Sequence, residues 1–305
     1  MRISTEMASK IQKAAAEAGY HPNQVAVSLR TGKSKIIALI VDTISGSFFS
    51  SLARIIEREA QAAGYRVIYC STGSNVKNGG EMIQMLHLYQ VDGYLIIPSA
   101  GMEKDIEQLL SSNKPFVLLD SYFPQIAAPY VLVDNYNGIT QGMEHLLQKG
   151  YRKIAFIGND VNMVQMDERE QAYQDALKRA GLRFSKASVC KTKYHDTKEA
   201  VVAQITAFIT RHKPDAVVFG ANYLGVYGLE SIKGLGLSIP DDIALVCFDD
   251  LDLFSLYPPG ITSIRQPIEA IAETAMHLLL QAMNGKEKTQ KGLQLEPQMI
   301  VREST

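Results

Sequence analysis

After residue 35 the chain alternates two patterns of apolar residues. Short runs of consecutive apolar residues indicate strands that are covered on both faces. Longer stretches, in which apolar positions recur every three or four residues, indicate helices. Strands that alternate with helices in this way are typical of βαβ units and a parallel sheet. The pattern therefore predicts an α/β fold.

The predicted elements form two series of similar length. The first has strands at Ile36–Val41, Val67–Cys70, Tyr94–Ile97, Phe116–Leu119 and Val131–Val133, with helices at Phe48–Ala63, Gly80–Gln90 and Glu103–Ser112. The second has strands at Ile154–Ile157, Ser188–Cys190, Ala216–Phe219 and Ile243–Phe248, with helices at Asp167–Ala180, Thr197–Thr210 and Asn222–Leu235. Two such series predict two lobes with a ligand cleft beyond the carboxyl ends of their strands.

Polar residues stand where several of these strands end. Asp120, the pair Asp249 and Asp250, Asn222 and the segment Ser45–Phe49 all follow predicted strands. Parallel strands place their carboxyl ends at one edge of a sheet, so we expect these groups to line the same rim.

The first 35 residues follow a different pattern. A helix is predicted over Thr5–Ala18, and Tyr20–Asn23 interrupts it, because a proline disfavours helix at the residue before it. Asn23 is then the expected N-cap of a second helix, Gln24–Arg30. That helix is too short to be stable alone and should order only against a partner.

Composition and charge narrow the class of protein. The 305 residues are 46% hydrophobic with a net charge of −1, which excludes a polybasic protein that holds nucleic acid by bulk charge. Residues 1–35 differ from the rest, since six basic and two acidic side chains give them a net charge of +4. Cys70, Cys190 and Cys247 are few and far apart, and Met1–Lys10 has no apolar signal region. A cytoplasmic protein is expected.

An ordered set of motifs along the whole chain resembles the lactose-repressor (LacI/GalR) family of bacterial transcription regulators. The motifs are Gly19–Asn23 with Ser28–Arg30, Ile36–Phe49, Gln90–Gly93, Gly150–Ile154, Gly236–Asp250, Thr262–Pro267 and Val301–Thr305. Members of this family open with a helix-turn-helix headpiece, and here the chain begins at what resembles the third headpiece helix. We therefore expect the helices that read the major groove to be missing.

The resemblance implies a fold and a division of the chain. It implies two Rossmann-like lobes of the periplasmic-binding-protein type, joined by crossover strands and preceded by a partial helical headpiece and a hinge helix. The implied parts are a headpiece and hinge at 1–35, an N-terminal lobe at 36–134 plus 265–292, and a C-terminal lobe at 135–264 plus 293–305.

The resemblance also assigns the hinge helix a role on DNA. It implies that Leu29 wedges into a minor-groove base step, that Arg30 lies in that groove and that Asn23 contacts phosphate. The alternative is that Leu29 packs on the protein and Arg30 is solvated.

Residues at the predicted rim are candidates for an effector site. A sugar or nucleobase needs polar partners and an aromatic face. The polar candidates are Asp120, Arg169, Asn222, Asp249 and Gln266, and the stacking candidates are Phe48, Phe49 and His195. Structural roles remain as alternatives: Phe48 and Phe49 as core residues, Arg169 paired with Asp167, and Asp249–Asp250 as the cap of a turn.

The sequence thus favours a ligand-responsive repressor that binds operator DNA as a homodimer and responds to a small effector, expected to be a carbohydrate. By resemblance, Phe48–Ala63 and Gly80–Gln90 are the interface helices. The motifs of nucleotide-dependent and hydrolytic enzymes are missing, so no catalytic residue, cofactor or metal ligand is expected. The alternative function is a sugar-binding protein of a transport system without a DNA role.

Overall fold

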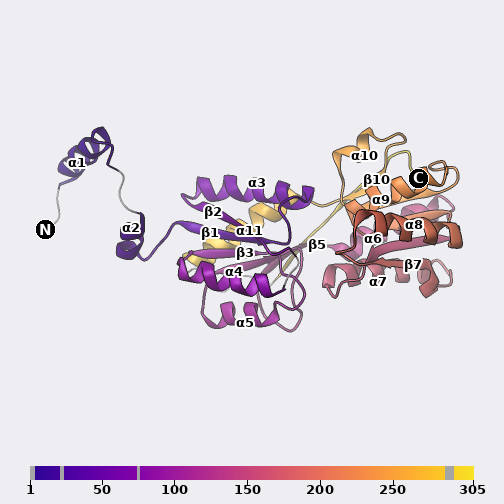
Figure 1. Cartoon of the computed structure of the whole chain (residues 1–305), viewed down its shortest axis with the longest axis horizontal. Coiled ribbons are helices and arrows are strands. Elements are labelled where there is room, and N and C mark those ends of the chain that lie inside the picture. Colours follow the sequence, from indigo (N-terminus) through magenta and orange to yellow (C-terminus); the bar gives the residue numbers. More distant parts are fainter. Residues whose placement is uncertain (1–3, 21–23, 74–75, 286–291) are drawn as a thin grey trace.

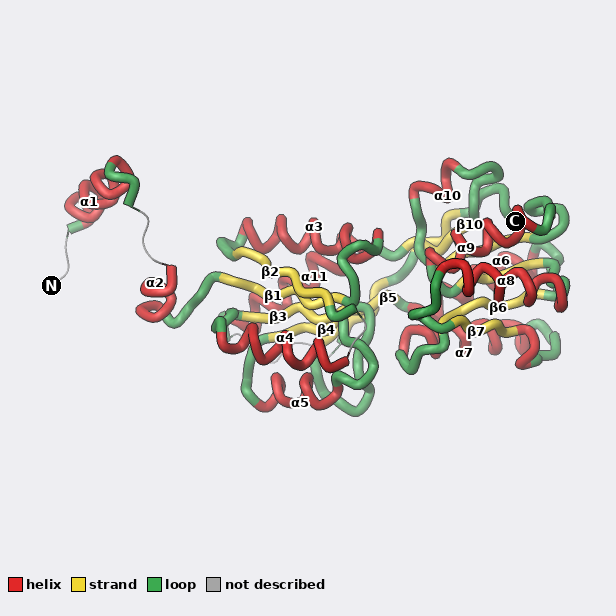
Figure 2. The backbone as a smooth tube through the Cα atoms, viewed as in Figure 1, coloured by secondary structure: helices red, strands yellow, loops and turns green. Residues whose placement is uncertain are grey.

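The computed structural model describes residues 4–20, 24–73, 76–285 and 292–305. Two α/β lobes lie side by side, and two short helices extend from the first lobe (Figures 1 and 2). In the described part of the chain no helix is both long and apolar enough to span a bilayer. The predicted α/β class with two lobes is confirmed.

The first lobe contains a fully parallel six-stranded sheet. Its strands, in spatial order, are β11 (Leu293–Leu295), β5 (Tyr130–Val133), β4 (Phe116–Leu119), β3 (Gly93–Ile96), β1 (Ile36–Val41) and β2 (Arg66–Ser71). The helices of this lobe are α3 (Ser47–Ala62), α4 (Val76–Leu88), α5 (Glu103–Ser111) and α11 (Ile268–Met283). Strands β1, β3 and β4 are almost wholly buried, as their unbroken apolar runs predict.

The second lobe repeats this plan with one antiparallel edge. Its strand order is β12 (Gln298–Ile300), β10 (Thr262–Arg265), β9 (Ala244–Phe248), β8 (Ala216–Phe219), β6 (Ile154–Asn159) and β7 (Val189–Thr192), with β12 antiparallel to β10. Its helices are α6 (Asn135–Gln148), α7 (Val164–Arg179), a 3-10 turn (Lys186–Ser188), α8 (Lys198–His212), α9 (Asn222–Gly234) and α10 (Asp252–Leu256). The sequence pattern did not single out α6, α10, α11, β10, β11 or β12.

Three connections join the lobes, after β5, after β10 and between β11 and β12. Strand β11 pairs with β5 in the sheet of the first lobe. The expected boundary of that lobe at residue 292 is therefore wrong by one short strand, because three residues from Leu293 complete the sheet edge before the chain crosses over.

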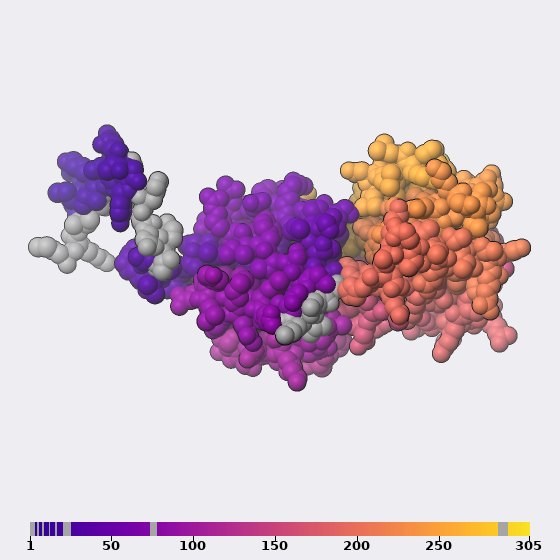
Figure 3. All heavy atoms as spheres, in the orientation of Figure 1, coloured from indigo at the N-terminus to yellow at the C-terminus, as the bar shows by residue number. Residues whose placement is uncertain are grey.

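The N-terminal helices α1 (Thr5–Glu17) and α2 (Gln24–Thr31) stand apart from both lobes (Figure 3). They join the body where the Asp92 carboxylate accepts hydrogen bonds from the backbone N–H groups of Ser34 and Lys35, at 2.9 and 3.0 Å. Both helices fall where the sequence predicts them. That the chain lacks earlier headpiece helices stays a prediction.

Candidate functional site

The candidate site lies where the carboxyl ends of strands from both lobes face each other. Asp42 follows β1 and Asp120 follows β4 in the first lobe, while Asp249 follows β9 in the second. Asn222 is the first residue of α9 and follows the end of β8 after Gly220 and Ala221, and Arg169 lies on α7. Both parallel sheets thus present polar side chains at the edge where such folds bind ligands.

Arg169 is the buried cation of this site. Its side chain is only 3% exposed, and its guanidinium lies 3.6 Å from the centroid of the Phe248 ring. Its Nε donates to Asn135 Oδ1 at 2.9 Å and its Nη1 donates to the Gly220 carbonyl at 2.7 Å. Burial lowers the pKa of Arg169, and the charges of Asp249 and Asp120 oppose that shift. The bonds to Asn135 and Gly220 replace the Asp167 pair that was the alternative.

Asp120 and Asp249 occupy equivalent positions in the two lobes. Both have left-handed backbone angles, with φ of 60° and 68°, at the point where a buried strand turns into a loop. Aspartate adopts this conformation more readily than most residues. Each carboxylate accepts from a glutamine: Gln165 Nε2 is 3.5 Å from Asp120 Oδ2, and Gln266 Nε2 is 2.6 Å from Asp249 Oδ1.

The two aspartates share the field of one guanidinium. Burial raises the pKa of Asp120 to about 6; the charge of Arg169 opposes this shift and that of Asp249 adds to it. Two carboxylates and one cation are therefore close enough to influence one another, and the sequence prediction that groups Asp120, Arg169 and Asp249 agrees with this placement.

Asp250 differs from its neighbour Asp249. It accepts from Arg302 Nη1 at 2.8 Å and from Arg302 Nη2 at 3.0 Å, and Ser263 and Arg265 also donate to it. Burial raises the pKa of Asp250, but these hydrogen bonds outweigh burial and hold the pKa below its usual value. Asp250 thus stabilises the second lobe, whereas Asp249 faces the site.

Three hydrogen bonds among the described residues join the two lobes at the candidate site. Tyr194 donates to Asp42 Oδ2 at 2.5 Å, and Asn222 Nδ2 donates to Ser47 Oγ at 3.3 Å. Gln165, on the second lobe, donates to Asp120 on the first. These contacts place the predicted residue Asn222 next to the start of α3.

The predicted aromatic residues have different surroundings. Phe48 and Phe49 form an edge-to-face pair with centroids 5.4 Å apart, and both are half-buried against the apolar core. His195 is exposed, and its ring contacts only the edge of the Tyr194 ring among the ring pairs of the described residues. Phe48 and Phe49 thus pack against the apolar core and also follow Ser47, which bonds Asn222 across the interface. His195 is exposed to solvent and contacts the Tyr194 ring.

Sequence reasoning missed five residues of the site: Asp42, Asn159, Gln165, Tyr194 and Tyr223. Tyr223 donates to Asn159, and its ring lies 6.1 Å from that of Tyr194. Burial raises the pKa of both tyrosines. Asp42 carried a usable signal, because it directly follows a predicted strand.

Gln266 lies in the connection between β10 and α11. It is 6% exposed, and its Oε1 atom is buried without a hydrogen-bond partner among the described residues. The Oε1 atom of Gln165 is in the same condition. A buried acceptor without a hydrogen bond is energetically unfavourable. A ligand that donates to these two glutamine oxygens would therefore gain free energy on binding.

The predicted DNA-contact residues lie on α2, apart from this site. Leu29 is 72% exposed, so it does not pack on the body, and Arg30 is exposed as well. Asn23 lies outside the described residues.

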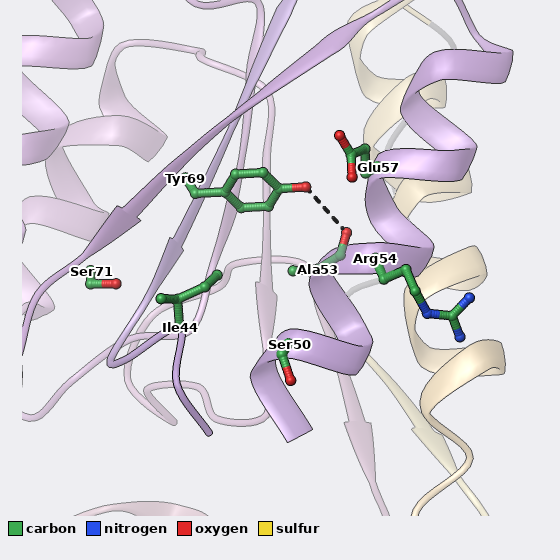
Figure 4. A pocket seen from close by; sticks show the side chains of 7 residues that line it. All are labelled: Ile44, Ser50, Ala53, Arg54, Glu57, Tyr69 and Ser71. Carbon is green, nitrogen blue, oxygen red and sulfur yellow. Dashed lines mark hydrogen bonds between the residues drawn. The ribbon is translucent and has the colours of Figure 1, made fainter. Parts of the chain in front are cut away.

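An open pocket of about 380 Å³ lies elsewhere on the first lobe (Figure 4). It is lined by Ile44, Ser50, Ala53, Arg54, Glu57, Tyr69 and Ser71, from α3, β2 and the loop before α3. Tyr69 donates to the Ala53 carbonyl across it at 3.4 Å. None of the sequence-predicted site residues lines this pocket.

The chain matches known regulators over nearly its whole length. A family model described as a periplasmic binding protein-like domain matches residues 143–305. A transcriptional regulator, PtxS of Pseudomonas plecoglossicida, is 30% identical over 99% of this chain and 88% of its own length. The ribose operon repressor of Haemophilus influenzae is 29% identical over 99% of this chain and 90% of its own. The structure of a complex of the regulator CelR with cellobiose has a TM-score of 0.82 at 25% identity and covers 100% of this chain and 92% of that one.

These relatives are transcription regulators. The alternative function, a sugar-binding protein of a transport system, is therefore wrong. The resemblance stated from the motifs is confirmed. The chain belongs to the LacI family of transcriptional regulators, with the periplasmic-binding-protein-like fold of that family.

Proposed function

We propose that this chain is a non-enzymatic repressor that binds operator DNA as a homodimer in the cytoplasm and responds to a sugar held between its lobes. The observation that carries the proposal is the polar cluster at the lobe interface, to which both lobes contribute. Asp120 comes from the first lobe, and Arg169 and Asp249 come from the second. The printed names of relatives, a ribose operon repressor and a CelR–cellobiose complex, support a sugar as the effector class.

In this proposal the effector contacts the sequence-predicted set: Phe48, Phe49, Asp120, Arg169, His195, Asn222, Asp249 and Gln266. The lobes are the two sheets with their helices, with the first lobe extended through Leu295. A ligand that contacts both lobes binds one arrangement of them more tightly than another, so it shifts the equilibrium between arrangements.

The DNA contact of the proposal is made by α2. Leu29 is an exposed apolar side chain on a short helix beside exposed Arg30, as a minor-groove wedge requires. Two copies must meet to place two such helices in one groove, since an eight-residue helix is marginal alone. Helices α3 and α4 are the proposed dimer surface.

Chromatin immunoprecipitation of the full chain from its host tests this function. We expect enrichment of a few sites that share a palindrome, and a change in occupancy when the carbon source is changed among sugars. Leu29→Ala should lower the enrichment at every site, whereas Glu107→Gln, at an exposed position on α5, serves as the matched control. Absence of site-specific enrichment for the unaltered chain would refute the proposed function.

A further inference from the structure

The lobe interface carries more negative than positive charge. Among the described residues, Asp42, Asp120 and Asp249 lie there with the guanidinium of Arg169. The charges of Asp120, Asp249 and Arg169 act on one another. Tyr194, which donates to Asp42, also experiences the charge of Asp120. These groups therefore form one cluster, which carries two net negative charges when all three carboxylates are ionised.

Arg169 is partly committed to contacts within the protein. Two of its nitrogens already donate to Asn135 and Gly220, and its plane lies on the ring of Phe248. Strong recognition of a phosphate or carboxylate by arginine uses two parallel N–H donors. Of the five N–H donors of Arg169, the one on Nε and one on Nη1 are therefore used within the protein, and the charge of the guanidinium is shared with Asp120 and Asp249.

Two acceptors at the interface are buried without a donor among the described residues. Gln165 and Gln266 turn their amide N–H groups toward Asp120 and Asp249. A carboxylate accepts and does not donate, which fixes the orientation of both amides. Their Oε1 atoms are left buried and unpaired within the described structure. The hydroxyls of Tyr194 and Tyr223 already donate to protein acceptors.

We infer that this site selects an uncharged, hydroxyl-rich ligand and rejects sugar phosphates and sugar acids. Each ligand hydroxyl can donate to a carboxylate or to one of the unpaired glutamine oxygens, which removes the cost of leaving those acceptors buried without a donor. A phosphate or carboxylate would instead add negative charge to a cluster that already has an excess of it, where burial weakens screening. The inference rests on the proposed effector role of the lobe interface and narrows its ligand class.

Matched pairs of compounds test the inference at pH 7.5 with the full chain. Ribose is compared with ribose 5-phosphate, glucose with glucose 6-phosphate and gluconate, and galactose with galactose 1-phosphate and galacturonate, with cellobiose as an additional uncharged probe. We expect at least one uncharged compound to raise the Tm by about 3 °C or more. Calorimetry should then show its charged counterpart to bind at least about tenfold more weakly.

Two variants test whether the carboxylates of the lobe interface cause the preference for uncharged ligands. Asp249→Asn keeps a side chain that tolerates the left-handed backbone and should weaken the uncharged compound at least about tenfold. It should also narrow the gap between that compound and its phosphate, because one repelling charge is gone. Asp120→Asn provides the same test on the other lobe, and Glu107→Gln should leave both affinities unchanged.

Three results would overturn the inference: a phosphate or acid that binds as tightly as its uncharged partner, no stabilisation by any uncharged compound, or unchanged affinities in both folded asparagine variants. A phosphorylated effector that still altered operator occupancy would overturn it while the proposed function stood. Loss of all site-specific DNA enrichment would instead count against the proposed function alone.

Discussion

Replacing Asp120 with asparagine should stabilise the protein at neutral pH and not in acid. Burial raises the pKa of this carboxyl to about 6 from an ordinary value of 3.8. A group whose pKa is higher in the folded than in the unfolded state favours folding below the unfolded value and loses that contribution as the pH rises through the folded value. Asparagine does not titrate and fits the left-handed backbone, where φ is 60°. Compared with the unaltered protein, the variant therefore becomes more stable as the pH rises from about 4 to about 6.

The size of the effect follows from the pKa shift. A shift of roughly two units corresponds to about 3 kcal/mol of differential stability. The Asp120 side chain is only half-buried, and contact with solvent screens part of this energy. We expect a net gain of about 1 to 2 kcal/mol above pH 6, which corresponds to a rise in Tm of about 1.5 to 3 °C for a protein of this size.

Thermal unfolding of the full chain at pH 4.5 and pH 7.5 measures this difference. Asp120→Asn should melt higher than the unaltered protein at pH 7.5, and the gap should shrink at pH 4.5. Asp196→Asn, at an exposed position of the second lobe, is the matched control for the change of an aspartate to asparagine. Equal gaps for Asp120→Asn at the two pH values would refute the reasoning about its buried charge.

The ion pair of the second lobe, the glycines of α9 and the proposed dimer surface give three more predictions. Arg302→Met removes one of the two arginine partners of the nearly buried Asp250, and Arg265 still pairs with it, so the free energy of unfolding in urea should fall by about 1 to 2 kcal/mol. Gly228→Ala would press a Cβ into the Phe219 ring and should lower the Tm, whereas an alanine at Gly234, with open space around it, should raise it slightly. Leu88→Glu, at a side chain 82% exposed on α4, should shift sedimentation from dimer toward monomer; an unchanged dimer would exclude α4 from the interface.

Strands that are buried on both faces were predictable, and close-packed or short elements were not. The strand at Ile36–Val41 matches its prediction residue for residue, because nothing polar interrupts the run. Helix α6 contains Gly138 and Gly142, and glycine is a poor helix former. Added Cβ atoms there would crowd Phe248, Ile264 and Val246, so tertiary packing requires both glycines. Strands β11 and β12 have three residues each, too few for a pattern.

In the candidate site, the residues that follow strands were predictable, and those that depend on contacts between the lobes were not. Asp120, Asp249 and Asn222 follow strands, and the rule that parallel sheets bind ligands beyond the carboxyl ends of their strands predicts that the three lie together. Tyr194 and Gln165 lie outside the predicted helices and strands, and the contacts they make depend on how the lobes meet. No periodicity along the chain encodes a contact such as Tyr194–Asp42, which joins residues 152 positions apart.

Gln266 belongs both to the candidate effector site and to a segment that connects the two lobes. It donates to Asp249 inside the candidate site, and it lies in the connection that leads from β10 into α11. Helix α11 packs on α3, and Arg58 of α3 pairs with Glu269 and Glu273 of α11. A ligand can shift the lobes only by as much as its contacts differ between their arrangements. In the proposed function, a ligand hydroxyl that donates to Gln266 Oε1 contacts a segment that connects the lobes, so this contact is expected to differ between their arrangements.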